Sequence, residues 1–245
     1  MMRGKNVIIT GANRGIGKKL VETFSQAGAN VWACMRKRDE EYIHWISQTA
    51  SVNKVWIKPI YFDMSDELSL CDGIKDIFDD NVCIDALINN AGVSTVGLLS
   101  QSKIGDIKAL FNVNYFSVLS IIQKVSKKMS RQKYGVIINM GSVAGIESQP
   151  GKIAYGSSKA AIHLMTRCLA KELGPLGIRV NAIAPGPVET EMIHQYNDEK
   201  LKLLSMEASL RRLGKAEEIA QVALFMASDK ASYINGEIIK VDGGR

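Results

Sequence analysis

Short apolar runs rich in β-branched residues alternate along this chain with longer stretches of helical periodicity. Such runs, bounded by turn residues, are typical of buried strands, whereas apolar positions three or four residues apart indicate an amphipathic helix. In the first helical stretch Ile16, Leu20, Val21 and Phe24 share one face, and Gly28 marks its end. We predict strands at Asn6–Thr10, Asn30–Met35, Val55–Phe62, Ala86–Asn89, Gly135–Met140, Arg179–Ile183 and Glu237–Val241. The later helices are predicted at Glu40–Thr49, Glu67–Asp79, Lys103–Ser130, Ile153–Leu173 and Ala216–Ala227.

This alternation predicts a single α/β domain over residues 1–245, because no linker, charge block or repeat interrupts the chain. We expect a doubly wound sheet of about seven parallel strands flanked by helices on both faces. Pro59 is unfavourable in a central strand, so we expect it to mark an irregular start of the third strand. Residues 187–212 lack a strand pattern and are rich in charged residues, Met and Leu, which predicts a lid-like segment above the sheet.

Composition excludes several classes of function. The net charge is +6, but the basic residues are dispersed and lack the interleaved aromatic residues of a nucleic-acid platform. No run of eighteen apolar residues occurs and the chain leads directly into its first strand, so we expect no transmembrane helix or signal peptide. Cysteines and histidines lack metal-ligand spacing. We therefore expect a cytoplasmic protein with reduced thiols, no metal, no membrane contact and no nucleic-acid partner.

A glycine-rich turn follows the first predicted strand directly and opens the first predicted helix. Glycines there let the backbone approach a pyrophosphate, and the helix N-terminus offers its amides to the phosphates. This position between strand and helix predicts dinucleotide binding on a Rossmann-type fold. The residues that we expect to contact the cofactor here are Gly11, Asn13, Arg14, Gly15, Ile16 and Gly17.

The end of the second predicted strand indicates which dinucleotide is bound. NAD-binding proteins of this class usually carry an acidic residue there, which accepts from the ribose 2′-hydroxyl. This chain reads Ala33-Cys34-Met35-Arg36-Lys37-Arg38, without a carboxylate. Arg36 and Arg14 would pair with a 2′-phosphate instead, so we predict NADP(H).

Tyr155 and Lys159 have the spacing that the predicted chemistry requires, and Ser142 lies thirteen residues upstream of the tyrosine. On a helix these two side chains project from one face roughly 6 Å apart, so the ammonium favours ionisation of the phenol. Such a proton donor suits reduction of a carbonyl, whose oxygen needs a proton as hydride reaches its carbon. A nucleophilic Ser142 is the rival interpretation, but no Gly-x-Ser-x-Gly turn surrounds it and no histidine is placed to serve it.

Together these features resemble the short-chain dehydrogenase/reductase family. The motifs that carry the resemblance are Thr10–Gly17, Asn89-Asn90-Ala91-Gly92, Asn114, Ser142, Tyr155-x-x-x-Lys159 and Pro185-Gly186, in this order. The resemblance spans the whole chain. The stretch Pro185–Met192 and the ending Val241-Asp-Gly-Gly244 look most like bacterial 3-oxoacyl-[acyl-carrier-protein] reductases.

The resemblance implies a role for each catalytic candidate. Tyr155 would be the general acid that protonates the carbonyl oxygen, and Ser142 would hold that oxygen by its hydroxyl. Lys159 would lower the pKa of Tyr155 and hydrogen-bond the nicotinamide ribose. Asn114 would hold a water that links Lys159 to bulk solvent. Because apolar residues surround Asn114 in a predicted helix, we expect it to be buried and to need a partner.

The resemblance also implies cofactor contacts beyond the glycine-rich turn. Asp63 would accept from the adenine amino group, and the backbone of Asn90, Ala91 and Gly92 would meet the adenosine ribose. After the sixth strand, the nicotinamide carboxamide and the pyrophosphate would be held by Pro185, Gly186, Val188 and Thr190. These positions follow the carboxyl ends of strands, where open α/β sheets bind ligands.

The substrate implied by the resemblance is a 3-oxoacyl group on acyl carrier protein, in fatty acid biosynthesis. Lys128, Arg131 and Lys171 occupy places comparable to those of carrier-binding residues, and the +6 charge suits an acidic partner. The Gln149–Ala154 segment departs from the family pattern before the tyrosine. An apolar acyl tunnel could be lined by Met192, His194, Tyr196, Leu203, Leu204 and Met206.

Two alternatives stay open at this point. The lid residues suit a steroid, sugar or polyketide ketone equally well, so another alcohol/ketone pair is possible. A non-catalytic NADP-binding sensor is the other alternative, which the intact catalytic set opposes. The resemblance further implies a homotetramer, or a homodimer, packed through the two long helices and the C-terminal region.

Overall fold

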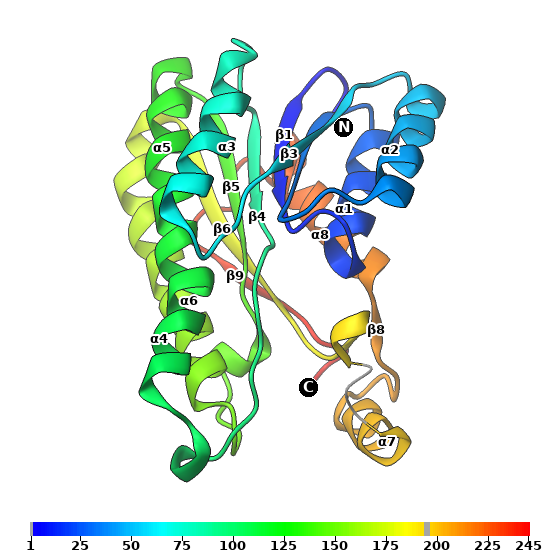
Figure 1. Cartoon of the computed structure of the whole chain (residues 1–245), viewed down its shortest axis with the longest axis vertical. Coiled ribbons are helices and arrows are strands. Elements are labelled where there is room, and N and C mark those ends of the chain that lie inside the picture. Colours follow the sequence, from blue (N-terminus) through cyan, green and yellow to red (C-terminus); the bar gives the residue numbers. More distant parts are fainter. Residues whose placement is uncertain (1, 194–196) are drawn as a thin grey trace.

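The computed structural model describes residues 2–193 and 197–245, and its centre is a single parallel sheet (Figure 1). Its seven strands lie in the order β3-β2-β1-β4-β5-β6-β9. The strands are β1 (Asn6–Thr10), β2 (Asn30–Met35), β3 (Ile57–Tyr61), β4 (Ala86–Asn89), β5 (Gly135–Met140), β6 (Ile178–Pro185) and β9 (Ile238–Val241). Because the order reverses between β1 and β4, a crevice for ligands is expected where their carboxyl ends diverge.

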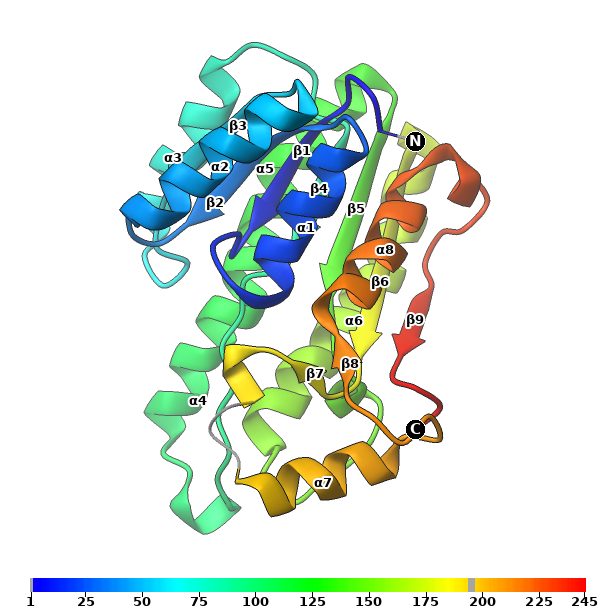
Figure 2. The same ribbon diagram turned by 90° about the vertical axis from the view of Figure 1, so that its right-hand side faces the viewer.

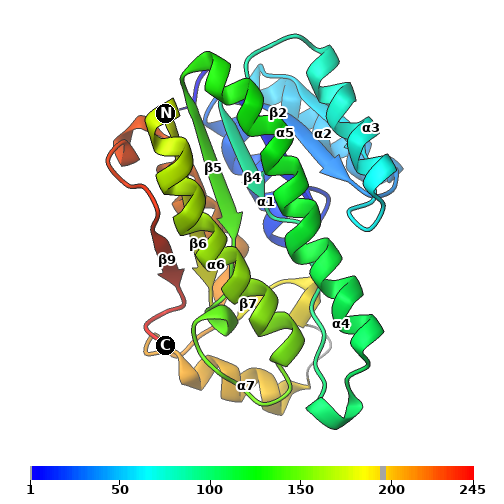
Figure 3. The same ribbon diagram turned by 90° about the vertical axis from the view of Figure 1, so that its left-hand side faces the viewer.

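Helices cover both faces of the sheet (Figures 2 and 3). The helices are α1 (Gly15–Gln26), α2 (Glu40–Asn53), α3 (Glu67–Asp79), α4 (Ile104–Phe111), α5 (Ser117–Gln132), α6 (Ile153–Leu173), α7 (Asp198–Glu207) and α8 (Ala216–Ala227). Apolar side chains of α1, α2 and α8 form one core with one face of the sheet. Those of α3, α5 and α6 form a second core with the opposite face. The predicted doubly wound α/β domain is confirmed.

The strand pattern explains how the sheet acquires two cores. Alternate residues of a strand point to opposite faces, so Ile8 joins one core while Val7 and Ile9 join the other. Every residue of β5 is buried. A strand that is covered on both faces is apolar at successive positions, which is why these runs lack a polar alternation.

Several predicted boundaries are confirmed to the residue, among them those of β1, β2, β4 and β5 and of the helices Glu67–Asp79, Ile153–Leu173 and Ala216–Ala227. The expectation for Pro59 was wrong. Pro59 lies in the middle of β3, in register with Ala33 of β2, and β3 is the edge strand of the sheet. An edge strand can present one side without a hydrogen-bond partner, so the missing N–H of proline is tolerated there.

The predicted helix Lys103–Ser130 was wrong as one continuous helix. A π-helical turn, Asn112–Phe116, separates α4 from α5. Such a turn inserts one extra residue into the helical ladder and is frequent at functional sites. It contains Asn114, which is fully buried, as predicted.

The segment 187–212 contains more structure than its sequence pattern predicts. Val188–Glu189 forms the short strand β7, which pairs in parallel with β8 (Gly214–Lys215), so the expected absence of strand was wrong. Helix α7 lies beyond the carboxyl ends of the central strands (Figure 2). Two residues predicted to line an acyl tunnel, His194 and Tyr196, lie outside the described residues.

Within residues 2–193 and 197–245, none of the helices combines the length and the apolar character that crossing a bilayer requires.

Candidate active site

The candidate residues from distant parts of the chain meet at the carboxyl edge of the sheet. The glycine-rich turn follows β1, Asn90–Gly92 follows β4, Ser142 follows β5 and Gly186 follows β6. Parallel strands all end at this edge, so four segments that are separate in sequence become neighbours. The topology therefore builds the site that the motifs predict.

Direct hydrogen bonds tie the glycine-rich turn to the end of β4. The hydroxyl of Thr10 accepts from the backbone N–H groups of Asn90 and Ala91, each at 3.0 Å. The side-chain amide of Asn90 donates to the carbonyl oxygens of Thr10 and Gly11, at 3.0 and 3.1 Å. The Asn90 side chain thus has a structural role that its predicted backbone contact with a ribose did not include.

Two glycines let the turn pack this closely. Gly11 has φ +65°, and a Cβ there would lie 2.9 Å from the Cα of Ala91. A Cβ on Gly17 would lie 1.8 Å from the carbonyl oxygen of Gly11. The first turn of α1 can therefore approach the end of β1 only because no side chain separates them.

Replacing Gly17 with alanine is expected to lower the free energy of unfolding by about 1–3 kcal/mol, because the added methyl overlaps backbone that cannot rotate away. The matched control is Gly105→Ala in α4, where a Cβ meets no atom within 4 Å. That change should stabilise the chain by roughly 0.5–1 kcal/mol, since alanine is the better helix former. Chemical denaturation of both variants measures the difference. Equal stability of the two variants would contradict the packing argument.

The same turn fits the phosphates of a dinucleotide. No side chain among the described residues caps the N-terminus of α1, and its first turn contains no acidic residue. The free amides and the positive end of the helix dipole therefore face the crevice at this edge, which is the arrangement that binds a pyrophosphate. Asn13 and Ile16 lie within this turn as predicted.

The predicted arginine pair lies close to the crevice, but the two side chains have different surroundings. Arg14 donates to Glu191 at 3.2 Å, and both side chains are exposed. Arg36 is exposed at the end of β2. Hydrogen bonds from Ser65, with weaker help from the Arg36 charge, lower the pKa of Asp63. Joint binding of one phosphate by Arg14 and Arg36 stays a prediction.

The segment after β6 crosses in front of the glycine-rich turn. Gly186 donates its N–H to Val241 at 3.0 Å, and Val188 is buried. The side chain of Thr190 lies 3.4 Å from the place where a Cβ of Gly15 would be. The predicted contact Thr190 therefore lies beside the phosphate-binding turn, and Pro185, Gly186 and Val188 precede it in the same segment.

Tyr155 lies in the first turn of α6, with Lys152 at the N-cap and Lys159 in the second turn. The Nζ atoms of Lys152 and Lys159 lie 5.6 and 5.8 Å from the centre of its ring. Positions i−3 and i+4 share the helix face of Tyr155, which explains this arrangement. Lys159 was predicted beside the phenol from its spacing, whereas no role was predicted for Lys152.

Lys159 is buried, with only 5% of its surface exposed. Its Nζ donates to the carbonyl oxygen of Met140, the last residue of β5, at 2.7 Å. Burial lowers the pKa of Lys159 to about 8. At neutral pH Lys159 is therefore still charged, and because it is shielded from water its electric field is only weakly screened.

Ser142 is held against α6 by a short 3₁₀ turn, Val143–Gly145. Its hydroxyl accepts from the N–H of Ala144 at 3.2 Å. A Cβ on Gly156 would lie 2.6 Å from the carbonyl oxygen of Ala144, so glycine at this position lets the turn contact the helix that carries Tyr155. This contact places the Ser142 turn against the helix that carries Tyr155.

Asn114 has its amide groups satisfied by local partners. Its Oδ1 accepts from the N–H of Val93, and its Nδ2 donates to the carbonyl of the same residue, each at 2.9 Å. Nδ2 also donates to the hydroxyl of Ser158 at 3.1 Å, and that hydroxyl donates to the carbonyl of Tyr155. Asn114 therefore orients both the segment after β4 and the first turns of α6.

Gly92 leaves a small space beside both Asn114 and Lys159. A Cβ on Gly92 would lie 3.3 Å from Asn114 Oδ1 and 3.5 Å from Lys159 Nζ. Asn114 Oδ1 and Lys159 Nζ thus lie on the same small space beside Gly92, where the predicted water could contact both residues.

Two features were not predicted from the sequence: the buried His163 on α6, and a buried hydrogen-bond network between the ends of β4 and β5 and α6. His163 lies one turn after Lys159 and is buried. Burial, with the Lys159 charge adding to it, lowers the pKa of His163 to about 4, so the ring is neutral at pH 7. Asn89 donates to Asn139, and Asn139 to Thr166, at 2.9 and 3.0 Å. Polar residues in the middle of apolar strands are the signal that could have found this network.

The basic residues predicted to bind a carrier protein lie at the opposite edge of the sheet. Lys128 and Arg131 lie near the end of α5, just before β5 begins, whereas Ser142 follows the end of that strand. Lys171 lies sixteen residues after Tyr155 on α6, roughly 24 Å along the helix axis. Lys128 also donates to the carbonyl of Phe78 at 3.2 Å. Within one subunit these residues do not join the candidate site.

In the part of the chain that the structure describes, no group of three or more His, Cys, Asp or Glu side chains is placed so that it could hold a metal ion.

Comparison with known proteins identifies the family. Residues 11–245 match a family model described as enoyl-(acyl carrier protein) reductase. A solved short-chain dehydrogenase/reductase family protein superimposes with a TM-score of 0.86 at 30% identity, covering 99% of this chain and 97% of the other. The chain belongs to the short-chain dehydrogenase/reductase family. The predicted resemblance is confirmed, and the protein is an oxidoreductase of this family.

Two curated members of the family differ in their named activities. A 3-oxoacyl-[acyl-carrier-protein] reductase from Thermotoga maritima is 37% identical over 99% of this chain and 98% of its own length. A 3alpha-hydroxysteroid dehydrogenase from Mediterraneibacter gnavus is 34% identical over 99% of this chain and 97% of its own length. Both names describe the interconversion of a carbonyl and an alcohol.

Proposed function

We propose that this protein is a cytoplasmic, NADPH-dependent reductase that converts a 3-oxoacyl thioester on acyl carrier protein to the 3-hydroxyacyl thioester. The observation that carries the proposal is the convergence of Ser142, Tyr155, Lys159 and Asn114 beside an uncapped, glycine-rich helix N-terminus. The similarity to the Thermotoga maritima reductase over nearly the whole of both chains supports the substrate class.

In this proposal Tyr155 gives the carbonyl oxygen its proton. The Ser142 hydroxyl donates a hydrogen bond to the same oxygen, and this bond strengthens as negative charge develops there. The neighbouring Lys159 ammonium stabilises the phenolate that remains on Tyr155. When bound, the nicotinamide cofactor supplies the hydride that reaches the carbonyl carbon.

Reprotonation of Tyr155 is proposed to run through Lys159. The pKa of Lys159 is lowered to about 8, so this residue can release and regain a proton near neutral pH. A Cβ on Gly92 would lie close to both Asn114 Oδ1 and Lys159 Nζ, so this is where we propose that a water links Lys159 to solvent. Asn114 would act there by orienting a water rather than by exchanging protons itself.

The proposed cofactor preference rests on charge at the end of β2. Arg36 is exposed there, and the adjacent Lys37 adds a second positive charge. A guanidinium binds a phosphate through paired hydrogen bonds, whereas it gives a ribose hydroxyl little advantage. Arg14 would join Arg36 after leaving its contact with Glu191.

Binding of a carrier protein is proposed to involve a second subunit. Lys128, Arg131 and Lys171 lie too far from the site of their own chain to guide a substrate into it. Phe116, the last residue of the π-helical turn before α5, and Leu164 of α6 are 58% and 63% exposed. Packing of these helices between subunits would cover the apolar side chains, in a homodimer or homotetramer, and place the basic residues near a neighbouring site.

A ketone other than an acyl thioester is the second candidate, favoured by the similarity to the steroid dehydrogenase. Initial rates of NADPH oxidation with acetoacetyl-carrier-protein, a 3-oxosteroid and simple ketones separate the candidates. We expect kcat/KM to be highest with the carrier-bound substrate. A higher value for the steroid would replace the proposed substrate, and tight NADPH binding without turnover of any carbonyl would favour the sensor.

Substitution of Arg36 tests the proposed preference for NADPH over NADH. Arg36→Ala should lower kcat/KM for NADPH by about 10- to 100-fold, the order expected for a lost pair of charge-assisted hydrogen bonds, and leave that for NADH nearly unchanged. Arg3→Ala, an exposed arginine before β1 at the opposite edge of the sheet, serves as the control. A wild-type enzyme that prefers NADH would refute the role of Arg14 and Arg36.

A further inference from the structure

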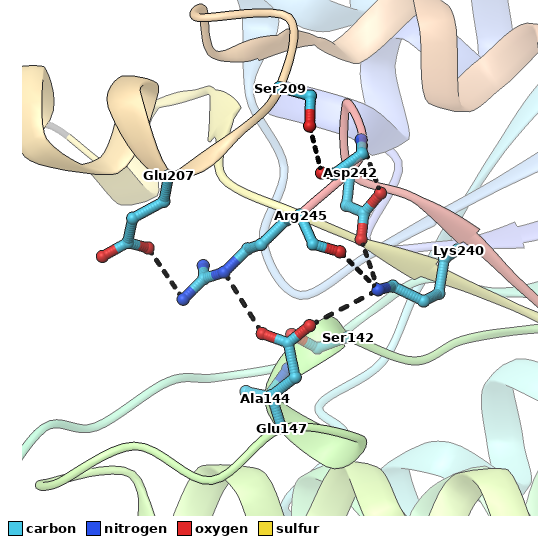
Figure 4. A network of polar contacts seen from close by, with 9 residues as sticks. Ser142, Ala144, Glu147, Glu207, Ser209, Lys240, Asp242 and Arg245 are labelled. Atoms are coloured by element: carbon cyan, nitrogen blue, oxygen red, sulfur yellow. Dashed lines mark hydrogen bonds and ion pairs between the residues drawn. The ribbon is translucent and has the colours of Figure 1, made fainter.

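An ion-pair network connects the turn that holds Ser142 with the end of α7 (Figure 4). Its centre is Arg245, whose Nε lies 3.2 Å from a carboxylate oxygen of Glu147. A terminal nitrogen of the same guanidinium lies 2.7 Å from a carboxylate oxygen of Glu207, the last residue of α7. One side chain therefore bridges two segments that border the candidate substrate site.

Glu147 is coupled directly to the Ser142 turn. Its N–H donates to the carbonyl of Val143 at 2.8 Å, and Val143 begins the turn in which the Ser142 hydroxyl accepts from the N–H of Ala144. Displacement of Glu147 would therefore be transmitted to the backbone that positions the Ser142 hydroxyl.

The second carboxylate belongs to a helix with little other anchorage. No residue of α7, which lies wholly within the described part of the chain, is buried. Leu203 and Met206 are more than half exposed. A helix without a buried apolar face gains little from packing, so its position depends on contacts at its ends.

Further contacts fix the segment that carries Arg245. Ser209 donates its hydroxyl to the carbonyl of Gly244 at 2.7 Å, and Leu210 donates its N–H to the carbonyl of Gly243 at 3.1 Å. The Nζ of Lys240 donates to the carbonyl of Arg245 at 2.7 Å and lies 3.4 Å from Glu147. The backbone that carries the Arg245 side chain is thus fixed by contacts that do not involve its guanidinium.

The burial of the Arg245 side chain makes this bridge stronger than an ordinary surface ion pair. Only 12% of the side chain is exposed, and its partners Glu147 and Glu207 are 33% and 39% exposed. Both partners of the pairs Arg14–Glu191 and Arg38–Glu40 are more than half exposed. Exposed pairs contribute little because water and salt screen them, and shielding from water reduces that screening. A guanidinium between two carboxylates also forms a network rather than a single pair.

We propose that Arg245 is a positioning residue that joins α7 to the Ser142 turn and so sets the placement of the lid over the carbonyl site. This rests on the proposed reductase function for its kinetic consequence, but the bridge itself does not. Arg245 touches neither substrate nor cofactor in this proposal. It acts through Glu147 and Glu207.

The test compares Arg245→Met with Arg245→Lys in the full-length protein. Arg245→Met should raise the KM for acetoacetyl-carrier-protein about 10-fold, change kcat less than 3-fold and leave the Kd for NADPH unchanged. Hydrogen–deuterium exchange of residues 198–207 should become faster by a similar factor. Arg245→Lys keeps one charged donor and should recover part of both effects.

Lys58→Met is the matched control, since it removes a 2.5 Å ion pair with Asp80 between β3 and the end of α3. Glu207→Gln should reproduce the effect of Arg245→Met, and the double variant should be no worse than either single one. Unchanged exchange in α7 would overturn the proposal, as would equal effects of Lys58→Met. Faster exchange in a protein that turns over no carbonyl would leave the bridge standing and refute the reductase assignment alone.

Discussion

Replacement of Tyr155 by phenylalanine is expected to lower kcat for carbonyl reduction by about 10²- to 10⁴-fold, the range supplied by a positioned general acid. The substitution removes only the phenolic hydroxyl, so the ring can keep its place between Lys152 and Lys159. The Kd for NADPH, measured by the change in cofactor fluorescence, should change little. A reduced rate with intact cofactor binding assigns the loss to proton transfer.

The control is Tyr134→Phe. Tyr134 lies just before β5, at the edge of the sheet opposite the candidate site. This variant should keep wild-type kcat. Near-full activity of Tyr155→Phe would sink the proton-donor assignment, whatever the behaviour of the control.

Replacement of Lys159 by methionine is expected to have opposite effects on activity and on stability. Loss of the ammonium beside Tyr155 should lower kcat by about 10²-fold or more, because the phenol loses the charge that stabilises its ionised form. The same change should raise the free energy of unfolding at pH 7. Burial lowers the pKa of Lys159 to about 8, so the folded state holds this charge at a cost, on the order of 3 kcal/mol before the lost hydrogen bond to Met140 is counted.

The stability of the wild-type protein should depend on pH, because the pKa of Lys159 differs between the folded and the unfolded chain. Between about pH 8 and the ordinary lysine pKa of 10.5, the unfolded chain binds more protons at this position than the folded one. Wild-type stability should therefore rise with pH across this window, and the full cost of the buried charge is present below it. Lys159→Met lacks this term, so the gap between the two proteins should narrow from pH 7 to pH 10.

Chemical denaturation at several pH values measures the stability difference. Lys171→Met, an exposed lysine on the same helix, is the matched control and should change neither stability nor the rate with a free ketone. A Lys159→Met protein that is less stable than wild type at pH 7 would show that the hydrogen bond to Met140 outweighs the desolvation of the charge.

The differences between prediction and structure have identifiable physical causes. Periodicity identified the stretch 103–130 as helical, but it cannot reveal the π-helical turn at Asn112–Phe116. That turn carries the buried hydrogen bonds of Asn114 to Val93 and Ser158, which depend on tertiary contacts. Pro59 was misjudged because the position of β3 at the edge follows from strand order. Lys128, Arg131 and Lys171 were predicted as carrier-protein contacts from the family resemblance, and only the fold shows at which edge of the sheet they lie.

What the sequence determined by itself is local chemistry. The glycine-rich turn, the Tyr155–Lys159 spacing and the strand and helix pattern are each encoded within a few residues, so their physical meaning can be worked out without a fold. These elements were enough to predict the α/β class, which the structure confirms, and to predict a dinucleotide cofactor and a proton donor. Tertiary structure decided which separate parts of the chain come into contact. Examples are the close approach of Gly17 to Gly11 within the glycine-rich turn and the hydrogen bond from Lys159 to Met140. The ion pairs of Arg245 with Glu147 and Glu207 are another. Burial and hydrogen-bond partners depend on how the whole chain packs, and therefore only the folded chain sets the pKa of Lys159 and the position of α7.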